Sequence, residues 1–212
     1  MYQAIIFDFD GTLVHTAPDI HYHVNQVLAA HGFKTRALPE VIHAIGLGVH
    51  SLMKDLAPAL AENPVLLEQI VKEFKASYQE KSVLSSETYP HVIEMLEGPL
   101  RKFKKAIVTN KPQSLTLIIL KQLNLTRYFD VVLGGEALHP HKPDPTSTSY
   151  ALERMNVKPE QTLFIGDSRI DFETANNAGV DFVWMDYGYD GSLKDQKNIR
   201  RFSSAKEWRM LA

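Results

Sequence analysis

Two carboxylates, Asp8 and Asp10, follow the apolar run that opens the chain, and their spacing suggests a site that holds a cation. The apolar run predicts a buried strand, which ends at Gly11 and Thr12. Residues i and i+2 of an extended segment share a face, so the two carboxylates should lie side by side, where they repel unless a cation lies between them. A lone Asp-x-Asp would fit a polar strand end equally well. The longer string Asp-x-Asp-Gly-Thr behind an apolar run favours chemistry.

Three later strand ends carry polar groups that complement this pair. They are Thr109-Asn110-Lys111, residues 141–145 (His-Lys-Pro-Asp-Pro) and residues 166–171 (Gly-Asp-Ser-Arg-Ile-Asp). The carboxyl ends of parallel strands meet at one edge of a sheet, so these segments should converge on Asp8 and Asp10. The predicted site therefore combines several carboxylates with a hydroxyl, an amide and one or two lysines.

This set of groups fits phosphoryl transfer better than other chemistry. Clustered carboxylate oxygens suit Mg²⁺, which takes few protein ligands and keeps waters and substrate phosphate oxygens. Hydroxyl, amide and ammonium donors can hold the charge of a transferring phosphoryl group. An aspartate can be the nucleophile and form an aspartyl phosphate, while a second aspartate gives a proton to the leaving oxygen and takes one from water.

The segments that must position these groups alternate between strand and helix. Strands alternating with helices imply parallel pairing through right-handed crossovers. The sequence therefore predicts an α/β fold with a doubly wound parallel-sheet (Rossmann-like) core, in which ligands bind beyond the carboxyl ends of the strands. After the first run, the predicted strands are 105–109, 131–134, 162–166 and 181–185, and the predicted helices are 112–123, 145–155 and 169–178.

The region from about Pro18 to Lys81 breaks this alternation. Its apolar residues have helical spacing, and no convincing strand lies among them. We predict an inserted helical cap domain at 16–83 and a core domain made of 1–15 and 84–212. The tail beyond Gly188 should be rich in loops, with one last helix near Ser204.

Composition narrows the classes of function. The chain has 212 residues and a formal net charge of −2, so electrostatics favours neither nucleic acid nor an anionic membrane surface as a partner. It has no cysteine, which excludes disulfides, thiolate metal sites and a cysteine nucleophile. Met1 runs into the first strand without room for a signal peptide, and no apolar run approaches about 18 residues. We expect a cytoplasmic monomer or homodimer whose partner is a small phosphorylated metabolite.

The nine histidines do not form a transition-metal motif. His21 and His23 are two positions apart on a predicted helix and do not share a face, while His139 and His141 flank a proline. Neither His-Glu-x-x-His nor a Cys/His spacing occurs, so surface or core positions account better for these side chains.

Four ordered motifs of the chain resemble those of the haloacid dehalogenase-like (HAD) hydrolase superfamily. They are Asp8-x-Asp10-Gly11-Thr12, Thr109-Asn110, Lys142-Pro143 and Gly166-Asp167-Ser168-x-x-Asp171. The chain most resembles the phosphoglycolate phosphatase-like branch of this superfamily. The features shared with that branch include Ala17-Pro18-Asp19, residues 108–112 (Val-Thr-Asn-Lys-Pro) and Ala178-Gly179, whereas His15 and His91 stand where many relatives carry Asp and Gly.

The resemblance implies a role for each motif residue. Asp8 would be the nucleophile and a Mg²⁺ ligand, and Asp10 the acid/base residue whose main-chain carbonyl also meets the metal. Lys142 would balance the charge of Asp8 and the phosphate. Asp167 would bind the metal, and Asp171, one helical turn further on, would complete the metal set by supporting its waters. The residues that would bind phosphate or substrate are Gly11, Thr12, Thr109, Asn110 and, in a cap loop, Gly46 and Gly48.

The activity implied by the resemblance is Mg²⁺-dependent hydrolysis of a small phosphomonoester, with 2-phosphoglycolate as the expected substrate, through an aspartyl phosphate. Asp10 favours a phosphatase over a dehalogenase, because an alcohol leaving group needs a proton and a halide does not. A β-phosphoglucomutase-like phosphotransferase and a pyrophosphatase of the same superfamily stay open. So does a catalytically idle binding or regulatory protein on the same scaffold.

Simpler interpretations stay open for several of these residues. Lys142 could be a solvated loop lysine, and Thr109 could cap the helix that follows it. Asp167 and Asp171 could be acids favoured at the start of a helix by its dipole. The glycines of Gly46-Leu47-Gly48 could end one helix and permit the next. For Lys111 we expect a surface charge rather than a phosphate contact.

Overall fold

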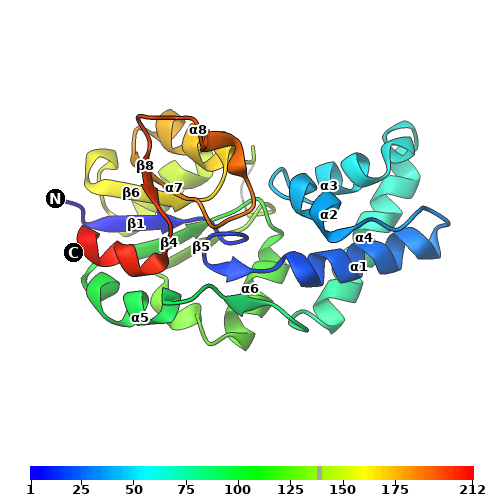
Figure 1. Ribbon diagram of the computed structural model, residues 1–212, viewed down its shortest axis with the longest axis horizontal. Coiled ribbons are helices and arrows are strands. Elements are labelled where there is room, and N and C mark those ends of the chain that lie inside the picture. Colours follow the sequence, from blue (N-terminus) through cyan, green and yellow to red (C-terminus); the bar gives the residue numbers. More distant parts are fainter. Residues whose placement is uncertain (138–139) are drawn as a thin grey trace.

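The computed structural model describes residues 1–137 and 140–212 and has a six-stranded parallel sheet at its centre (Figure 1). The strand order is β5-β4-β1-β6-β7-β8, so β1 and β6 are neighbours at the point where the order of the strands reverses. The predicted doubly wound α/β core is confirmed. The strands are β1 Ala4–Phe7, β4 Lys104–Val108, β5 Val131–Leu133, β6 Thr162–Gly166, β7 Asp181–Met185 and β8 Arg200–Phe202.

Alternate residues of β1 face different layers of helices, which explains why the whole strand is apolar. Ile5 and Phe7 pack in the cluster that includes α5 (Val92–Glu97), α6 (Gln113–Gln122) and the C-terminal 3₁₀ helix Ala205–Leu211. Ala4 and Ile6 pack with α7 (Thr146–Met155) and α8 (Arg169–Ala178) on the other face. Since both faces are covered, each position of β1 is buried.

Four α-helices are inserted between β2 (Val14–His15) and β3 (Glu87–Thr88), two short strands that pair antiparallel. The helices lie together beside the end of the sheet toward which β1 points, and all residues of this segment are described (Figure 1). No strand occurs between β2 and β3. The inserted helices are α1 Ala17–Ala30, α2 Leu38–Ala44, α3 Val49–Leu56 and α4 Pro64–Glu80.

The structure adds elements that the sequence patterns did not predict. The edge strand β8 lies in the tail for which we predicted loops, and it escaped notice because its three residues include only one apolar side chain, Phe202. Helix α5 is only six residues long, too short for a clear helical period. The predicted last helix near Ser204 is a 3₁₀ helix, and the Ser204 hydroxyl accepts a hydrogen bond from the backbone N–H of Lys206 at its start.

The prediction that the histidines are surface or core residues is confirmed for His23. His139 lies outside the described residues. His23 is buried in the cap, where its ring nitrogens lie 2.8 Å from Ser77 Oγ and 3.0 Å from the Lys81 carbonyl oxygen, so it is a polar core residue.

Within residues 1–137 and 140–212, no helix has the combination of length and apolar character that crossing a membrane requires.

Candidate active site

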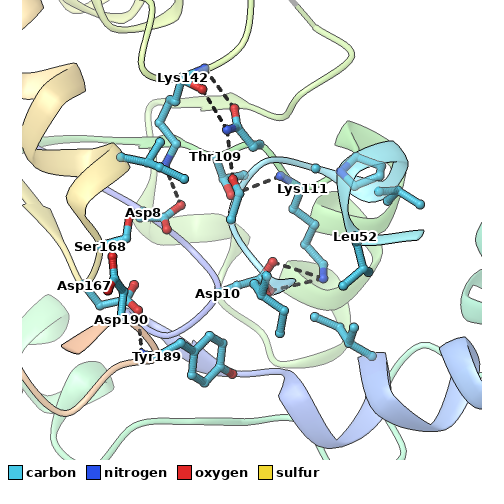
Figure 2. Close-up of a pocket in the computed structure, with 18 of the residues that line it drawn as sticks. Asp8, Asp10, Leu52, Thr109, Lys111, Lys142, Asp167, Ser168, Tyr189 and Asp190 are labelled. Carbon is cyan, nitrogen blue, oxygen red and sulfur yellow. Dashed lines mark hydrogen bonds and ion pairs between the residues drawn. The ribbon is translucent and has the colours of Figure 1, made fainter. Parts of the chain in front are cut away.

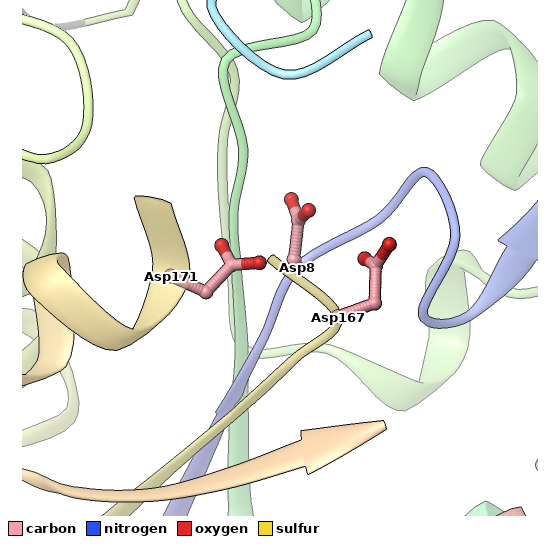
Figure 3. A group of neighbouring side chains, drawn as sticks. All are labelled: Asp8, Asp167 and Asp171. Atoms are coloured by element: carbon pink, nitrogen blue, oxygen red, sulfur yellow. The ribbon is translucent and has the colours of Figure 1, made fainter. Parts of the chain in front are cut away.

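The carboxyl ends of β1 and β6 bring three carboxylates together, as predicted (Figure 3). Asp8 follows β1, Asp167 follows β6 and Asp171 lies in the first turn of α8. Each offers an oxygen within 4.8 Å of those of the other two. The Asp8 side chain is 12% exposed and that of Asp171 is 0% exposed, so Asp8 is the more accessible of the two.

Lys142 is the cation of this cluster. Its Nζ lies 2.9 Å from Asp8 Oδ1 and 2.6 Å from Asp171 Oδ1, and the residue is buried. Burial alone would lower the pKa of Lys142, but the Asp171 and Asp8 carboxylates outweigh it and raise that pKa above the ordinary lysine value. Lys142 is therefore a charged residue of the site, and the interpretation as a solvated loop lysine is wrong.

Asp171 is held by the start of its own helix. Its Oδ2 accepts hydrogen bonds from the Ser168 backbone N–H at 3.0 Å and from Ser168 Oγ at 2.6 Å, while the Asp171 N–H donates to Ser168 Oγ at 3.2 Å. This reciprocal pair is a capping box, so Asp171 is indeed a first-turn acid. Its other oxygen faces Lys142, so one side chain both starts α8 and takes part in the cluster.

Asp167 is fixed by two donors from separate segments. Its Oδ1 accepts from the Thr12 hydroxyl at 2.9 Å, and its Oδ2 accepts from the Tyr189 backbone N–H at 2.7 Å. Thr12 is fully buried, and the hydrogen bond from its hydroxyl orients Asp167. Gly11 has a φ of +82°, and a Cβ there would lie 2.4 Å from Asp167 Oδ2, so this position requires glycine.

The electrostatics of the cluster fit a divalent cation. Burial raises the pKa of Asp167 well above its ordinary value, and the carboxylates of Asp171 and Asp8 raise it further. Burial also raises the pKa of Asp171, with a further contribution from Asp8, against the opposing effects of Lys142 and Ser168. One ammonium cannot neutralise three crowded carboxylates, and hard oxygen ligands of this kind suit Mg²⁺. The residues present therefore fit the predicted ion.

Asp10 faces the cap side of the site and has its own partners. The Thr16 hydroxyl donates to Asp10 Oδ1 at 2.5 Å, and Lys111 Nζ lies 3.1 Å from the same oxygen. Asp10 and Asp8 thus have different cations beside them, Lys111 and Lys142 respectively (Figure 2). This separation suits two carboxylates with different tasks.

The expectation that Lys111 is a surface charge is wrong. The residue is 7% exposed, and its Nζ also lies 4.9 Å from the centroid of the Tyr78 ring, which belongs to α4. The cap covers this lysine, because α4 packs against α6 directly after it in the chain. A pattern of residues local to the end of β4 does not contain that information.

Asn110 and Thr109 follow β4 and meet both the Lys142 loop and the cap. Asn110 Nδ2 donates to the carbonyl oxygens of Gly46 at 2.9 Å and Lys142 at 3.1 Å, and Asn110 Oδ1 accepts from the Lys142 backbone N–H at 2.9 Å. Thr109 does not cap α6, whose first turn is preceded by Pro112. Gly46 and Gly48 have φ values of +143° and +87°, so the loop between α2 and α3 uses backbone conformations that favour glycine.

These side chains line one cavity between the sheet and the cap (Figure 2). Its volume is about 60 Å³, enough for a few water-sized groups. The structure brings into its wall most of the predicted site residues, namely Asp8, Asp10, Thr109, Asn110, Lys142, Asp167, Gly46 and Gly48. Gly11, Thr12 and Asp171 are not in the wall and lie behind it, in contact with Asp167 or Lys142.

Comparison with known proteins identifies the family. The sequence model of the haloacid dehalogenase-like hydrolases matches residues 5–185, which include all of the strand-end motifs described above. The chain belongs to this family.

Relatives of this HAD-like hydrolase agree in length and fold. It is 38% identical to a phosphoglycolate phosphatase from Rhodobacter capsulatus over 89% of the chain and 86% of that protein. It is 35% identical to one from Nitrosospira multiformis over 89% of the chain and 85% of that protein. A crystal structure of a predicted phosphoglycolate phosphatase from Haemophilus somnus 129PT has a TM-score of 0.91 and 29% identity, covering 99% of this chain and 97% of that one.

Sequence reasoning missed the segment Tyr187 to Tyr189 of this HAD-like hydrolase. Besides the bond from the Tyr189 N–H to Asp167, the Tyr189 hydroxyl accepts from the backbone N–H groups of Thr16 and Ala17 at 2.8 and 2.9 Å. A Cβ on Gly188 would lie 2.2 Å from Asp167 Cβ, so the chain passes very close to this carboxylate. The available signal was position alone, since the segment follows β7 at the same edge of the sheet.

Proposed function

We propose that this hydrolase removes the phosphoryl group from 2-phosphoglycolate in a Mg²⁺-dependent reaction that passes through an aspartyl phosphate on Asp8. The observation that carries the proposal is the position of the Asp8 carboxylate in the cavity wall, beside Lys142 and next to Asp167 and Asp171. The names of the relatives from Rhodobacter capsulatus and Nitrosospira multiformis support the choice of substrate.

Asp8 and Asp167, together with Asp171 and the main-chain carbonyl of Asp10, would hold Mg²⁺. When bound, this ion supplies positive charge that polarises the phosphoryl oxygens. Thr12 and Tyr189 orient Asp167, and Ser168 orients Asp171, through the hydrogen bonds described above. Such supporting bonds keep acidic ligands in place while the cluster is charged.

The first chemical step belongs to Asp8 and Asp10. An Asp8 carboxylate oxygen attacks phosphorus, and the bond between phosphorus and the ester oxygen breaks as the new bond forms. Asp10 donates a proton to the departing oxygen, which leaves as the hydroxyl of glycolate. Lys142, 2.9 Å from Asp8 Oδ1, balances negative charge at the nucleophile.

The second step reverses the role of Asp10. As a carboxylate it takes a proton from water, whose oxygen attacks phosphorus and displaces Asp8, so that inorganic phosphate is released and both side chains are restored. We assign the Thr109 hydroxyl to the phosphoryl oxygens. To Asn110, whose amide is bonded to Lys142 and Gly46, we assign the positioning of these two segments.

We also propose the domain division that the sequence suggested, with a cap at 16–83 and a core at 1–15 and 84–212. The cap supplies the loop of Gly46 and Gly48 and one wall of the cavity. Enclosing the phosphoryl group there would exclude bulk water and strengthen the interactions of Lys142 and the aspartates.

The test measures release of inorganic phosphate from 2-phosphoglycolate in Mg²⁺ and in EDTA. We expect activity in Mg²⁺ only, with recovery when Mg²⁺ is restored. Asp8→Asn should lower kcat by at least about 10³-fold, because the amide cannot form the intermediate, and should keep an intact fold by circular dichroism. The matched control is Asp195→Asn at an exposed position of the tail, which should keep wild-type activity. Near-normal turnover by Asp8→Asn would refute the mechanism.

A further inference from the structure

Lys111 places a second ammonium in the wall of the cavity, beside Asp10, whereas Lys142 lies beside Asp8 (Figure 2). Its side chain is 4% exposed, and its Nζ lies 3.1 and 3.4 Å from the two Asp10 oxygens. An ammonium carries three N–H donors. Among the described residues, Asp10 is the one that accepts hydrogen bonds from Lys111 Nζ. The ammonium therefore keeps donor capacity for a ligand.

The charges of the cavity wall are unevenly distributed. Among the described residues of the wall, Lys111 and Lys142 supply the positive charge. Lys142 is engaged by Asp8 and Asp171, at the end where the phosphoryl group would react. Lys111 lies beside Asp10, the residue that would face the leaving oxygen. The cation nearest to the leaving group is therefore Lys111.

The cap side of the cavity is apolar apart from its backbone. The described side chains that α1 to α4 and their loops contribute to the wall are Ile20, Ile45, Val49, Leu52 and Phe74, besides the glycines Gly46 and Gly48. A leaving group with several hydroxyls, such as a sugar, would lose its hydrogen bonds to water against this surface and find few replacements. A short leaving group whose polar end is a single anion would suffer no such loss, because that anion can pair with Lys111.

We infer that Lys111 binds a carboxylate of the leaving group, so that the enzyme selects phosphate esters of short hydroxy acids over esters of neutral alcohols and sugars. This inference rests on the phosphatase activity proposed above and concerns the same cavity. It makes Lys111 a specificity-determining residue, supplied by the core, while the apolar cap excludes polyols.

The experiment compares kcat/KM for three esters of similar length: 2-phosphoglycolate, 2-hydroxyethyl phosphate and 2-aminoethyl phosphate. In the wild-type enzyme we expect kcat/KM to be highest for the ester with a carboxylate, lower for the ester with a hydroxyl and lowest for the ester with an amine. The ratio of kcat/KM between the first two should be about 10 to 100, the value of one charge-assisted hydrogen bond. In Lys111→Gln this ratio should fall toward one. Lys121→Gln, which removes an exposed lysine from the end of α6, should keep the wild-type ratio.

Using a ratio separates recognition from a general effect on Asp10. If Lys111→Gln lowers kcat/KM equally for both esters, Lys111 acts through Asp10 or the phosphoryl group and the inference is overturned. Lys111→Arg keeps the charge and should keep most of the kcat/KM ratio. This variant replaces Lys111→Gln in the test if the glutamine variant does not fold. A wild-type ratio near one also overturns the inference while leaving the phosphatase proposal intact. Absence of hydrolysis of any ester in Mg²⁺ instead contradicts the proposed function.

Discussion

The Asn110 side chain donates a hydrogen bond of 2.9 Å to the Gly46 carbonyl oxygen and so joins the cap loop to the end of β4. The same amide holds the backbone N–H and carbonyl of Lys142. One side chain therefore fixes both the cation beside Asp8 and the loop that closes over the cavity. This arrangement links the position of the cap loop to that of the lysine.

Replacing Asn110 by Ala should damage activity and stability together. The change removes three hydrogen bonds and leaves backbone groups of Lys142 without these partners, which costs about 1–3 kcal/mol of unfolding free energy. A misplaced Lys142 should lower kcat/KM for 2-phosphoglycolate by about 100-fold. Urea unfolding and steady-state kinetics measure the two effects.

The control for this variant is Asn177→Ala. Asn177 also donates to a neighbouring carbonyl, that of Pro143 at 2.9 Å, but on the exposed surface. Its loss should change the unfolding free energy by no more than about 0.5 kcal/mol. Equal effects of the two substitutions would show that Asn110 has no special role in coupling the cap to Lys142.

Mg²⁺ should stabilise the protein more at higher pH. Burial and mutual repulsion raise the pKa values of Asp167 and Asp171, so in the metal-free protein these carboxyl groups bind protons more tightly folded than unfolded. Stability of the metal-free form therefore decreases as pH rises through the raised pKa values, and a bound cation offsets this loss. The increase in Tm on adding Mg²⁺ should grow from about pH 5 to about pH 8. Thermal melts in EDTA and in Mg²⁺ measure it.

Asp167→Asn tests whether this pH dependence comes from the cluster. The variant lacks one titrating ligand, so both the size of the Mg²⁺ effect and its dependence on pH should shrink. A Tm increase that is the same at every pH, or is unchanged in Asp167→Asn, would place Mg²⁺ binding elsewhere.

Gly188→Ala should disturb Asp167 although the glycine carries no functional group. The added Cβ would lie 2.2 Å from Asp167 Cβ, so either the carboxylate or the Tyr187 to Tyr189 segment must move. We expect kcat/KM to fall by about 100-fold through displacement of this residue. The matched control is Gly32→Ala, since Gly32 has a φ of +74° with nothing within 4 Å of a Cβ and lies in the cap. It should cost about 1 kcal/mol of stability and leave activity unchanged, whereas equal activity of both variants would contradict the prediction.

The sequence predicted the acidic cluster because its members stand at strand ends. Asp8 and Asp167 each follow an apolar run that is buried on both faces, and the edge rule for parallel strands brings such ends together. Asp171 and Ser168 also satisfy a local rule, the capping box, which is visible in their spacing. Local sequence patterns and the predicted sheet topology were therefore enough to predict that these residues lie together.

Lys111 and Tyr189 could not be predicted in this way. Whether Lys111 is buried depends on where α4 packs, which is a contact between segments separated by some thirty residues and set by the cap. Tyr189 donates its backbone N–H to Asp167, and its hydroxyl accepts a hydrogen bond from the backbone just before α1. Both contacts depend on the conformation of the loop that carries Tyr189. Contacts of this kind arise from tertiary packing, which secondary-structure propensity and hydrophobic periodicity do not predict.

His23 should make the cap sensitive to acid. Burial lowers the pKa of His23 below the ordinary histidine value, despite the opposing effects of the Lys81 carbonyl and Asp19. The unfolded chain therefore takes up a proton at a higher pH than the folded one, and the stability present above about pH 6.5 is lost as pH falls below that value. His23→Gln keeps hydrogen-bonding capacity without titrating. Between about pH 7.5 and 5.5, urea unfolding should show a smaller loss of unfolding free energy in this variant than in the wild type.

The control for the acid effect is His43→Gln on the exposed surface of α2, which should follow the wild type across the pH range. If His23→Gln and the wild type lose stability in parallel, the acid sensitivity comes from other groups.

Asp19 fastens the point where the chain returns from the cap to the core. Its buried carboxylate accepts hydrogen bonds from the backbone N–H groups of Leu84, Ser85 and Ser86 at 3.1, 2.8 and 2.9 Å and from Ser86 Oγ at 2.6 Å. The carboxylate thus ties the start of α1 to the segment that precedes β3, which are the two connections between cap and core.

Asp19→Asn should loosen this connection. The amide keeps one acceptor oxygen but presents an NH₂ group to backbone donors, so at least one backbone N–H loses its partner and the charge-assisted bonds weaken. We expect a loss of about 2–3 kcal/mol in unfolding free energy, together with faster proteolysis near Leu84. Asp55→Asn, at an exposed position of α3, is the matched control and should change the unfolding free energy by no more than about 0.5 kcal/mol. Equal stability of the two variants, with the segment before β3 equally protected from protease, would mean that packing rather than Asp19 holds the two connections together.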